Sequence, residues 1–283
     1  MVLKVKEFIA KNGITQAMLA RSIGVSAPQV SQYLSDSYKG DVAGLESKLN
    51  DFMNNYAVRN DTDSVKITLT KNMKMTHFTI NETIVSRDLT VIHGEAGCGK
   101  TTAVKEFVKQ NPTTVFIEAI PGMSISSVLS EISVAIGLQP SKSSEAMIKA
   151  ISKEFKRREA VLIIDEAENL TTKTLEAIRR IWDFSAVPTV LVGTPALINN
   201  LKGRNGELLQ LYSRVSGKYE FKGLSESDWI NIFGEFSESI KEITTHLRRA
   251  MNIYKKAQRF AKADNAPMNL GHIKKASTMV ILG

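Results

Sequence analysis

Apolar residues change their spacing along this chain, and the changes divide it into three regions. Near the N-terminus they recur every three or four positions, as in amphipathic helices. Between residues 89 and 194, short unbroken apolar runs alternate with helix-forming stretches, and helical spacing returns after residue 224. The pattern predicts a small helical unit, then an α/β unit, then a helical C-terminal region.

Four apolar runs in the central region are predicted strands because each is short and rich in β-branched residues. They cover residues 89–93, 113–119, 160–166 and 189–194. Strands that alternate with helices and are apolar on both faces indicate a parallel sheet covered on both sides. The expected fold class is therefore α/β, a three-layer α/β/α unit with an all-α domain before it and a small helical lid after it. The intervening predicted helices are 102–108, 126–136, 145–158 and 173–184.

The predicted N-terminal domain covers residues 1–56. Thr15 and Ser26 each precede a run with helical spacing, and Gly24 lies between the two runs where a turn is expected. The pattern resembles a repressor-type helix-turn-helix, whose second helix enters the DNA major groove. The second helix has no Lys or Arg, so modest affinity for DNA is expected. A three-helix module for protein contacts is the alternative. The residues expected to face DNA are Gln29, Ser31, Gln32 and Tyr33, with Arg21 and Lys39 reaching phosphates.

Composition sets the remaining boundaries. Residues 57–66 are polar without an apolar period and are predicted to be a linker, so the core covers 67–222 and the lid 223–283. Residues 65–87 have room for one more helix before the first strand. The lid helices are expected at 225–236, 241–263 and 270–282.

A glycine-rich motif, G-x-x-x-x-G-K-T, follows the first predicted strand and precedes a helix-forming run, which is the context of a phosphate-binding loop. Its glycines let successive N–H groups point at a polyphosphate, and the next helix adds its positive end. Lys100 can contact the outer phosphates, and the Thr101 hydroxyl can hold Mg²⁺. The motif therefore predicts binding of ATP with Mg²⁺. The expected contacts are Gly94, Glu95, Ala96, Gly97, Cys98, Gly99, Lys100, Thr101 and Thr102.

Two acids end the third predicted strand. Ligands collect at the carboxyl ends of parallel strands, so Asp165 is expected to contribute a second Mg²⁺ contact. Glu166 can accept a proton from the attacking water or orient it. The pair favours ATP hydrolysis over binding alone; the alternative is that both acids only cap the next turn.

Composition and charge narrow the class of protein further. The chain has 283 residues, 43% hydrophobic and 23% charged, which is ordinary for a globular protein. It has no apolar run of membrane-spanning length and no secretion signal, so a cytoplasmic location is expected. Cys98 is the single cysteine, which excludes a disulfide framework and a cysteine-built zinc site.

The formal net charge is +8, and it is concentrated after residue 240. Residues 241–283 hold nine basic residues and two acids. A basic helical region suits a polyanion such as DNA, and a solvated helix face is the alternative.

The nucleotide motifs, G-E-A-G-C-G-K-T and L-I-I-D-E, resemble those of the AAA+ ATPases. By this resemblance, Thr194 would be the sensor-one residue at the end of the next strand, and Arg214 an arginine finger that acts on a neighbouring subunit. Arg204 is the rival finger. The sensor-two arginine would be Arg248, with Arg249 as its alternative. A plain salt bridge for Arg214 and a solvent-facing role for Arg248 and Arg249 remain open.

Domain order, domain size and the run Leu-Tyr-Ser-Arg-Val resemble more closely the target-DNA-activating ATPases of Mu-like transposable phages, over nearly the full chain. The resemblance implies a homo-oligomer, a helical filament or ring on double-stranded DNA, which binds largely without sequence preference. It presents that DNA to a transposase and dissociates after ATP hydrolysis. One departure is Thr194, where asparagine is expected. The proposed backbone contacts are Lys142, Lys149 and Lys153, each of which could instead be a solvated surface lysine.

Two other functions share parts of this organisation. A nucleotide-gated transcription regulator also joins a helix-turn-helix to a phosphate loop, but it usually adds a long sensor or repeat region, whereas 61 residues, 223–283, follow the predicted core here. A loader of replicative helicases shares the ATPase core but has no evident need for the N-terminal domain. Both remain alternatives.

Overall fold

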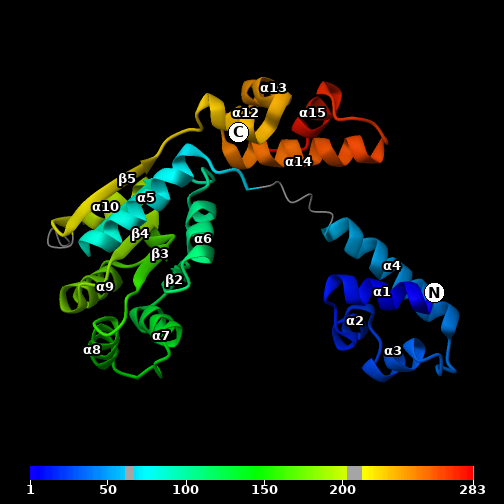
Figure 1. The fold of residues 1–283 in the computed structure, drawn as a ribbon, viewed down its shortest axis with the longest axis horizontal. Coiled ribbons are helices and arrows are strands. Elements are labelled where there is room, and N and C mark those ends of the chain that lie inside the picture. Colours follow the sequence, from blue (N-terminus) through cyan, green and yellow to red (C-terminus); the bar gives the residue numbers. More distant parts are fainter. Residues whose placement is uncertain (61–66, 203–211, 283) are drawn as a thin grey trace. The chain divides into compact units, whose positions relative to one another are not determined.

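The computed structural model describes residues 1–60, 67–202 and 212–282, with side chains omitted for 57–60. The chain divides into two compact units, Met1–Ile67 and Thr68–Gly283 (Figure 1). Among the described residues, no helix has both the length and the apolar character needed to cross a membrane.

Four helices form the first unit: α1 (Val2–Asn12), α2 (Gln16–Ile23), α3 (Ala27–Leu34) and α4 (Val42–Asn60). The two expected caps are present, because Thr15 accepts the N–H of Met18 and Ser26 accepts that of Gln29. Gly24 ends α2 in the left-handed region with φ 67°, as the predicted turn requires. The core of this unit contains Val5, Leu19, Val30, Leu34 and Leu49.

A five-stranded sheet with the order β2-β3-β4-β1-β5 is the centre of the second unit, and its strand pairs are parallel. The strands are β1 (Leu89–Gly94), β2 (Thr114–Glu118), β3 (Val161–Asp165), β4 (Thr189–Gly193) and β5 (Val215–Phe221). Sequence patterning missed β5. Its residues alternate between half-buried and exposed along most of its length, because it is an edge strand with one face toward solvent.

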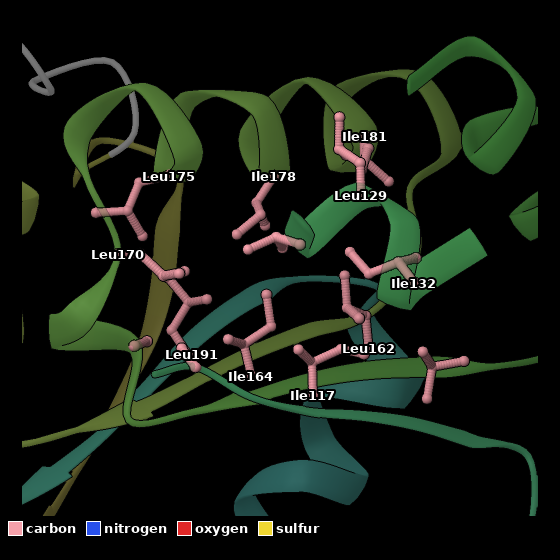
Figure 2. Close-up of a cluster of buried hydrophobic side chains, with 14 of the residues drawn as sticks. Ile117, Leu129, Ile132, Leu162, Ile164, Leu170, Leu175, Ile178, Ile181 and Leu191 are labelled. Atoms are coloured by element: carbon pink, nitrogen blue, oxygen red, sulfur yellow. The ribbon is translucent and has the colours of Figure 1, made fainter. Parts of the chain in front are cut away.

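Helices cover both faces of the sheet. On one face, α7 (Ile125–Ala135), α8 (Ser144–Phe155) and α9 (Thr172–Ser185) build a core around residues such as Leu129, Ile164 and Ile178 (Figure 2). On the other, α5 (Lys71–Ser86) and α6 (Lys100–Gln110) pack through Ile80 and Phe107. The predicted three-layer arrangement is confirmed. Two short elements follow β3 and β4: a 3₁₀ turn, η1 (Ala167–Asn169), and α10 (Pro195–Lys202).

The lid has its own core, which includes Trp229, Phe233, Ile240, Ile253 and Ile273. It consists of α12 (Glu226–Phe233), the 3₁₀ turn η2 (Gly234–Phe236), α13 (Ser237–Ile243), α14 (Leu247–Ala263) and α15 (Leu270–Ser277). The expected single helix over 241–263 was wrong, because α13 ends at Ile243 and α14 starts again at Leu247. Within the break, Thr245 and His246 line a cavity together with the phosphate loop.

Candidate nucleotide-binding site

The phosphate loop joins β1 to α6 through two glycines with left-handed backbones, Gly97 (φ 75°) and Gly99 (φ 104°). Residues that have a side chain rarely adopt these φ angles, so the two glycines allow a turn in which other residues would be strained. Lys100, the first residue of α6, is 8% exposed, and its Nζ donates to the carbonyls of Gly94 (2.8 Å) and Glu95 (3.0 Å). Its ammonium group therefore already lies inside the loop, where an outer phosphate would compete for it.

Asp165 ends β3 beside the loop and is 1% exposed. Its Oδ1 accepts the Glu166 N–H (2.9 Å), whereas Oδ2 is buried with no hydrogen-bond partner among the described residues. Burial raises the pKa of Asp165, and the Thr101 hydroxyl and the Glu166 N–H partly oppose this rise. An unpartnered carboxylate oxygen next to a hydroxyl is a donor set that suits Mg²⁺, so these residues fit the ion expected from the sequence.

Glu166 has a left-handed backbone with φ 54° and ψ 32°. A non-glycine residue in this region costs about 1–2 kcal/mol, and such strain gathers at functional sites. Desolvation raises the pKa of Glu166, and the charges of Glu168 and Asp165 raise it further. A carboxylate with a raised pKa is better suited to take a proton from water.

Sequence reasoning missed two residues in η1 that connect the strand ends. Glu168 Oε1 accepts the Thr194 N–H (3.0 Å), and Asn169 Nδ2 donates to the Ala119 carbonyl (3.1 Å). Together they hold the ends of β4 and β2 against the segment that carries Asp165 and Glu166. Their distance of three and four residues from Asp165 was the available signal, but polar residues in a short turn are common.

The lid touches the phosphate loop through consecutive residues. A Cβ added to Gly97 would lie 2.5 Å from Cε1 of His246 and 3.0 Å from Cβ of Arg248, and one added to Gly99 would lie 3.4 Å from Leu247. His246 Nδ1 is buried and has no partner within the described chain. A cavity of about 250 Å³ lies between the loop, the end of β5 and the lid. It is lined by Glu95, Ala96, Gly97, Cys98, Phe221, Lys222, Gly223, Leu224, Thr245, His246 and Leu247.

The two sensor-two candidates differ in their surroundings. Arg248 lies beside the loop with an exposed side chain, whereas Arg249 donates from Nη1 to the Leu282 carbonyl (3.0 Å). Only Arg248 of the two is next to the candidate nucleotide site.

Arg214 lies at the opposite end of the parallel strands from the phosphate loop. It immediately precedes β5, where Val215 is in register with Leu89, whereas Phe221 is in register with Gly94. The length of β1, roughly 17–20 Å at about 3.3 Å per residue, therefore separates Arg214 from its own loop. Its rival Arg204 lies outside the described residues.

The residues predicted to face DNA are only partly exposed. Tyr33 is 4% exposed and donates its hydroxyl to Glu46 (2.6 Å), so the prediction that it faces DNA was wrong. Burial is the main reason that the pKa of Tyr33 is raised. Gln29 accepts the Ser26 N–H in a capping box and is half-buried. The exposed residues of this set are Ser31 and Gln32, together with Arg21 and Lys39.

The three lysines expected on the DNA-facing side of the core are exposed. Lys142 precedes α8, and Lys149 and Lys153 lie one turn apart on it. Lys149 forms an ion pair with Glu145 (2.6 Å). Both side chains are solvated, so the ion pair is weak and leaves Lys149 available for another contact.

Comparisons with known proteins agree with this geometry. A family model described as an AAA domain matches residues 84–201. Among solved structures, Aeropyrum pernix ORC2 superposes with a TM-score of 0.58 and 15% identity, over 74% of this chain and 66% of that one. Domain III of Thermotoga maritima DnaA superposes with a TM-score of 0.50 and 13% identity, over 76% of this chain and 95% of that one. These similarities confirm the AAA+ fold.

Two relatives in sequence are more specific. The Mu-like prophage FluMu DNA transposition protein B of Haemophilus influenzae is 30% identical, over 80% of this chain and 81% of that protein. The ATP-dependent target DNA activator B of Escherichia phage Mu is 23% identical, over 76% of this chain and 70% of that protein. Because the first relative is this similar over four fifths of both chains, the present chain belongs to the family of Mu-like DNA transposition B proteins, which are AAA+ proteins.

Proposed function

We propose that this chain is a Mg²⁺-dependent ATPase that binds target DNA in its ATP state, delivers it to a transposase and releases it after hydrolysis. The single observation that carries the ATPase part is the buried, unpartnered Oδ2 of Asp165 beside Thr101 and the phosphate loop. The names of the two relatives, a DNA transposition protein and an ATP-dependent target DNA activator, support the DNA and transposase parts.

Each residue near the loop has a proposed role. Lys100 binds the outer phosphates through its Nζ, and Thr101 and Asp165 hold Mg²⁺, which neutralises phosphate charge when it is bound. Glu166 takes a proton from the attacking water. Glu168 accepts the N–H of Thr194. This supports a role for Thr194 as a fixed polar group at the carboxyl ends of the strands, where Asp165 and Glu166 also lie. The lid residues Leu247 and Arg248 close over the bound nucleotide.

Arg214 completes the site of a neighbouring protomer. It cannot reach its own phosphate loop, because the length of β1 lies between them. A cation that meets the transferred phosphate can be worth roughly 10³–10⁵ in rate. The function therefore requires an assembly, in which each nucleotide lies between two protomers.

DNA is held mainly through its phosphates. The exposed lysines Lys142, Lys149 and Lys153 support a sequence-independent contact by the core, since phosphate contacts carry affinity without reading bases. Ser31 and Gln32 remain exposed on α3 for a second contact by the N-terminal unit. That unit contributes modestly, because α3 has no cation.

The test measures DNA binding and phosphate release together. Lys100→Ala should lose ATP-dependent binding to duplex DNA. Glu166→Gln should bind DNA with ATP but fail to release phosphate, so it stays on the DNA. Equal DNA affinity of the unaltered protein with and without ATP would contradict the proposal, as would normal phosphate release by Glu166→Gln.

Footprinting separates the proposed function from its alternatives. Uniform ATP-dependent coverage of the duplex is expected here. A single protected operator would indicate a transcription regulator, and ATP-dependent capture of a replicative helicase without DNA coverage would indicate a helicase loader.

A further inference from the structure

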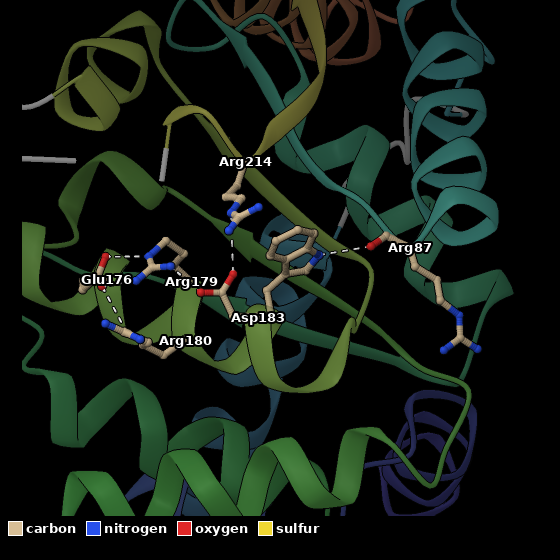
Figure 3. Close-up of polar contacts among 7 residues, drawn as sticks. Arg87, Glu176, Arg179, Arg180, Asp183 and Arg214 are labelled. Carbon is tan, nitrogen blue, oxygen red and sulfur yellow. Dashed lines mark hydrogen bonds and ion pairs between the residues drawn. The ribbon is translucent and has the colours of Figure 1, made fainter. Parts of the chain in front are cut away.

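A network of charged residues on α9 contacts the proposed finger, Arg214, through Asp183 (Figure 3). Arg179 is buried, with 4% of its side chain exposed, and it donates to Glu176 from Nε (2.8 Å) and Nη2. Its Nη1 donates to Asp183 Oδ2, which leaves the other oxygen of Asp183 free for a second arginine. Asp183 is thus held by a buried guanidinium group whose other two nitrogens donate to Glu176.

The second arginine is Arg214. Its Nε lies 3.8 Å from Asp183 Oδ1, and 55% of its side chain is exposed, compared with 19% for Asp183. Contact through Nε leaves the two terminal nitrogens of the guanidinium group outside this ion pair. These are the nitrogens that form a fork able to bind two phosphate oxygens at once.

The ion pair between Arg214 and Asp183 is weak compared with the other ion pairs of Asp183 and Glu176. An ion pair at 3.8 Å with a half-exposed arginine is longer than a hydrogen bond and contributes little to stability. Glu176 pairs with both Arg179 and Arg180. Asp183 also pairs with Arg179, so its charge is already partly compensated before Arg214 approaches. The contact with Asp183 therefore leaves the guanidinium group of Arg214 charged and largely exposed.

The end of α9 is also held from the side of α5. The indole N–H of Trp182 donates to the carbonyl of Arg87 (3.1 Å), one residue before Asp183. The carboxylate thus lies on a helix turn with two independent anchors, Trp182 and Arg179. A carboxylate on such a rigid turn gives the guanidinium group of Arg214 a fixed point of contact. Position matters here, because misplacing a catalytic group by about 1 Å can cost ~10²-fold in rate.

We propose that Asp183 is a positioning residue for the ATPase reaction: it aims the terminal nitrogens of Arg214 out of the protomer, toward the triphosphate bound by a neighbouring copy of this chain. The inference rests on the proposed role of Arg214 in trans. It adds that the finger is supported by an acidic residue of its own protomer, and that this residue acts only through Arg214.

The experiment uses mixtures of full-length variants on DNA. Glu166→Gln supplies an intact finger but no turnover, and Arg214→Ala supplies an intact site but no finger. If Arg214 acts in trans, the mixture should hydrolyse ATP although neither variant does so well alone. Asp183→Asn is then added either to the finger donor, Glu166→Gln, or to the finger acceptor, Arg214→Ala.

The donor placement should lower kcat of the mixture by on the order of tenfold with little change in KM for ATP, because finger geometry affects the transition state more than ground-state binding. The acceptor placement should cause no further loss, since that protomer has no finger to aim. Asp183→Glu in the donor should restore part of the rate. Glu176→Gln is the matched control, since the ion pairs of Glu176 within the described chain are with Arg179 and Arg180.

The outcomes separate the two claims. No activity in the unmodified mixture would remove the finger role of Arg214, and this inference with it. Restored activity that falls equally when Asp183→Asn is in the donor or in the acceptor would leave Arg214 as the finger. It would overturn the role of Asp183, because a residue needed only for folding shows no such asymmetry.

Discussion

The imidazole ring of His246 lies directly on the backbone of Gly97: a Cβ at residue 97 would lie 2.5 Å from the ring carbon Cε1. One residue belongs to the lid and the other to the phosphate loop, so this contact joins the two halves of the candidate nucleotide site. It exists because residue 97 has no side chain and because the lid chain is broken between α13 and α14. The lid therefore contacts the loop at a residue that has no side chain.

Gly97→Ala should weaken ATP binding by more than backbone strain alone explains. The methyl group would displace His246 and Arg248 and would strain a left-handed backbone, which costs about 1–2 kcal/mol. Titration with a fluorescent ATP analogue measures the effect. Gly137→Ala is the matched control, since Gly137 has a similar φ of 79° and nothing within 4 Å of an added Cβ.

His246→Ala should partly rescue Gly97→Ala. It removes the ring that meets the new methyl group, while the backbone strain and the contact with Arg248 remain. A double variant with the same affinity for the analogue as Gly97→Ala would show that the contact between lid and loop does not limit binding.

Glu168→Gln should shift the acid limb of the ATPase pH profile to lower pH. Glu166 must be ionised to accept a proton, and the charge of Glu168 helps to raise its pKa, so removing that charge lowers the pKa. The amide keeps an oxygen that can accept the Thr194 N–H. The dependence of kcat on pH at saturating ATP measures this, with the exposed Glu159→Gln as control. An unchanged limb would contradict Glu166 as the group that titrates.

Lys149→Gln should weaken binding to duplex DNA and flatten its salt dependence by roughly one unit of log–log slope. Its ion pair with Glu145 is solvated, so stability should change little. Affinity measured by fluorescence anisotropy over a salt series gives the slope. Lys109→Gln is a matched control, because Lys109 is also an exposed helix lysine paired with a glutamate of its own helix. Equal slopes for the two variants would place the DNA elsewhere.

Tyr33→Phe should lower the stability of the N-terminal unit without changing its DNA contacts. The lost hydrogen bond to Glu46 is buried at the tyrosine end and is worth about 1–2 kcal/mol. Thermal unfolding of the full chain measures the loss. Gln32→Ala, on the exposed side of α3, should have the opposite profile, with unchanged stability and weaker DNA binding. A Tyr33→Phe variant that loses DNA affinity while fully folded would restore Tyr33 as a contact residue.

Strands that are buried on both faces of the sheet could be predicted from the sequence. β1, β3 and β4 are buried at every position and stand out as apolar runs. β5 could not be found in this way, because only one of its faces is covered. Tyr33 was misassigned for a related reason: helical spacing located α3, but the packing of its neighbours decides which of its sides is buried.

The sequence by itself determined the phosphate loop and the acids that end β3, because these groups act through neighbours only a few residues away. Spacing along one strand–loop–helix unit already positions Lys100, Thr101 and the loop N–H groups. Only the tertiary structure decided that His246 meets Gly97, that Glu168 holds Thr194 and that Asp183 supports Arg214. The residues of each pair come from separate elements, and their contact depends on strand order, on the break before α14 and on the register of β5. The spacing of apolar residues within one element predicts none of these.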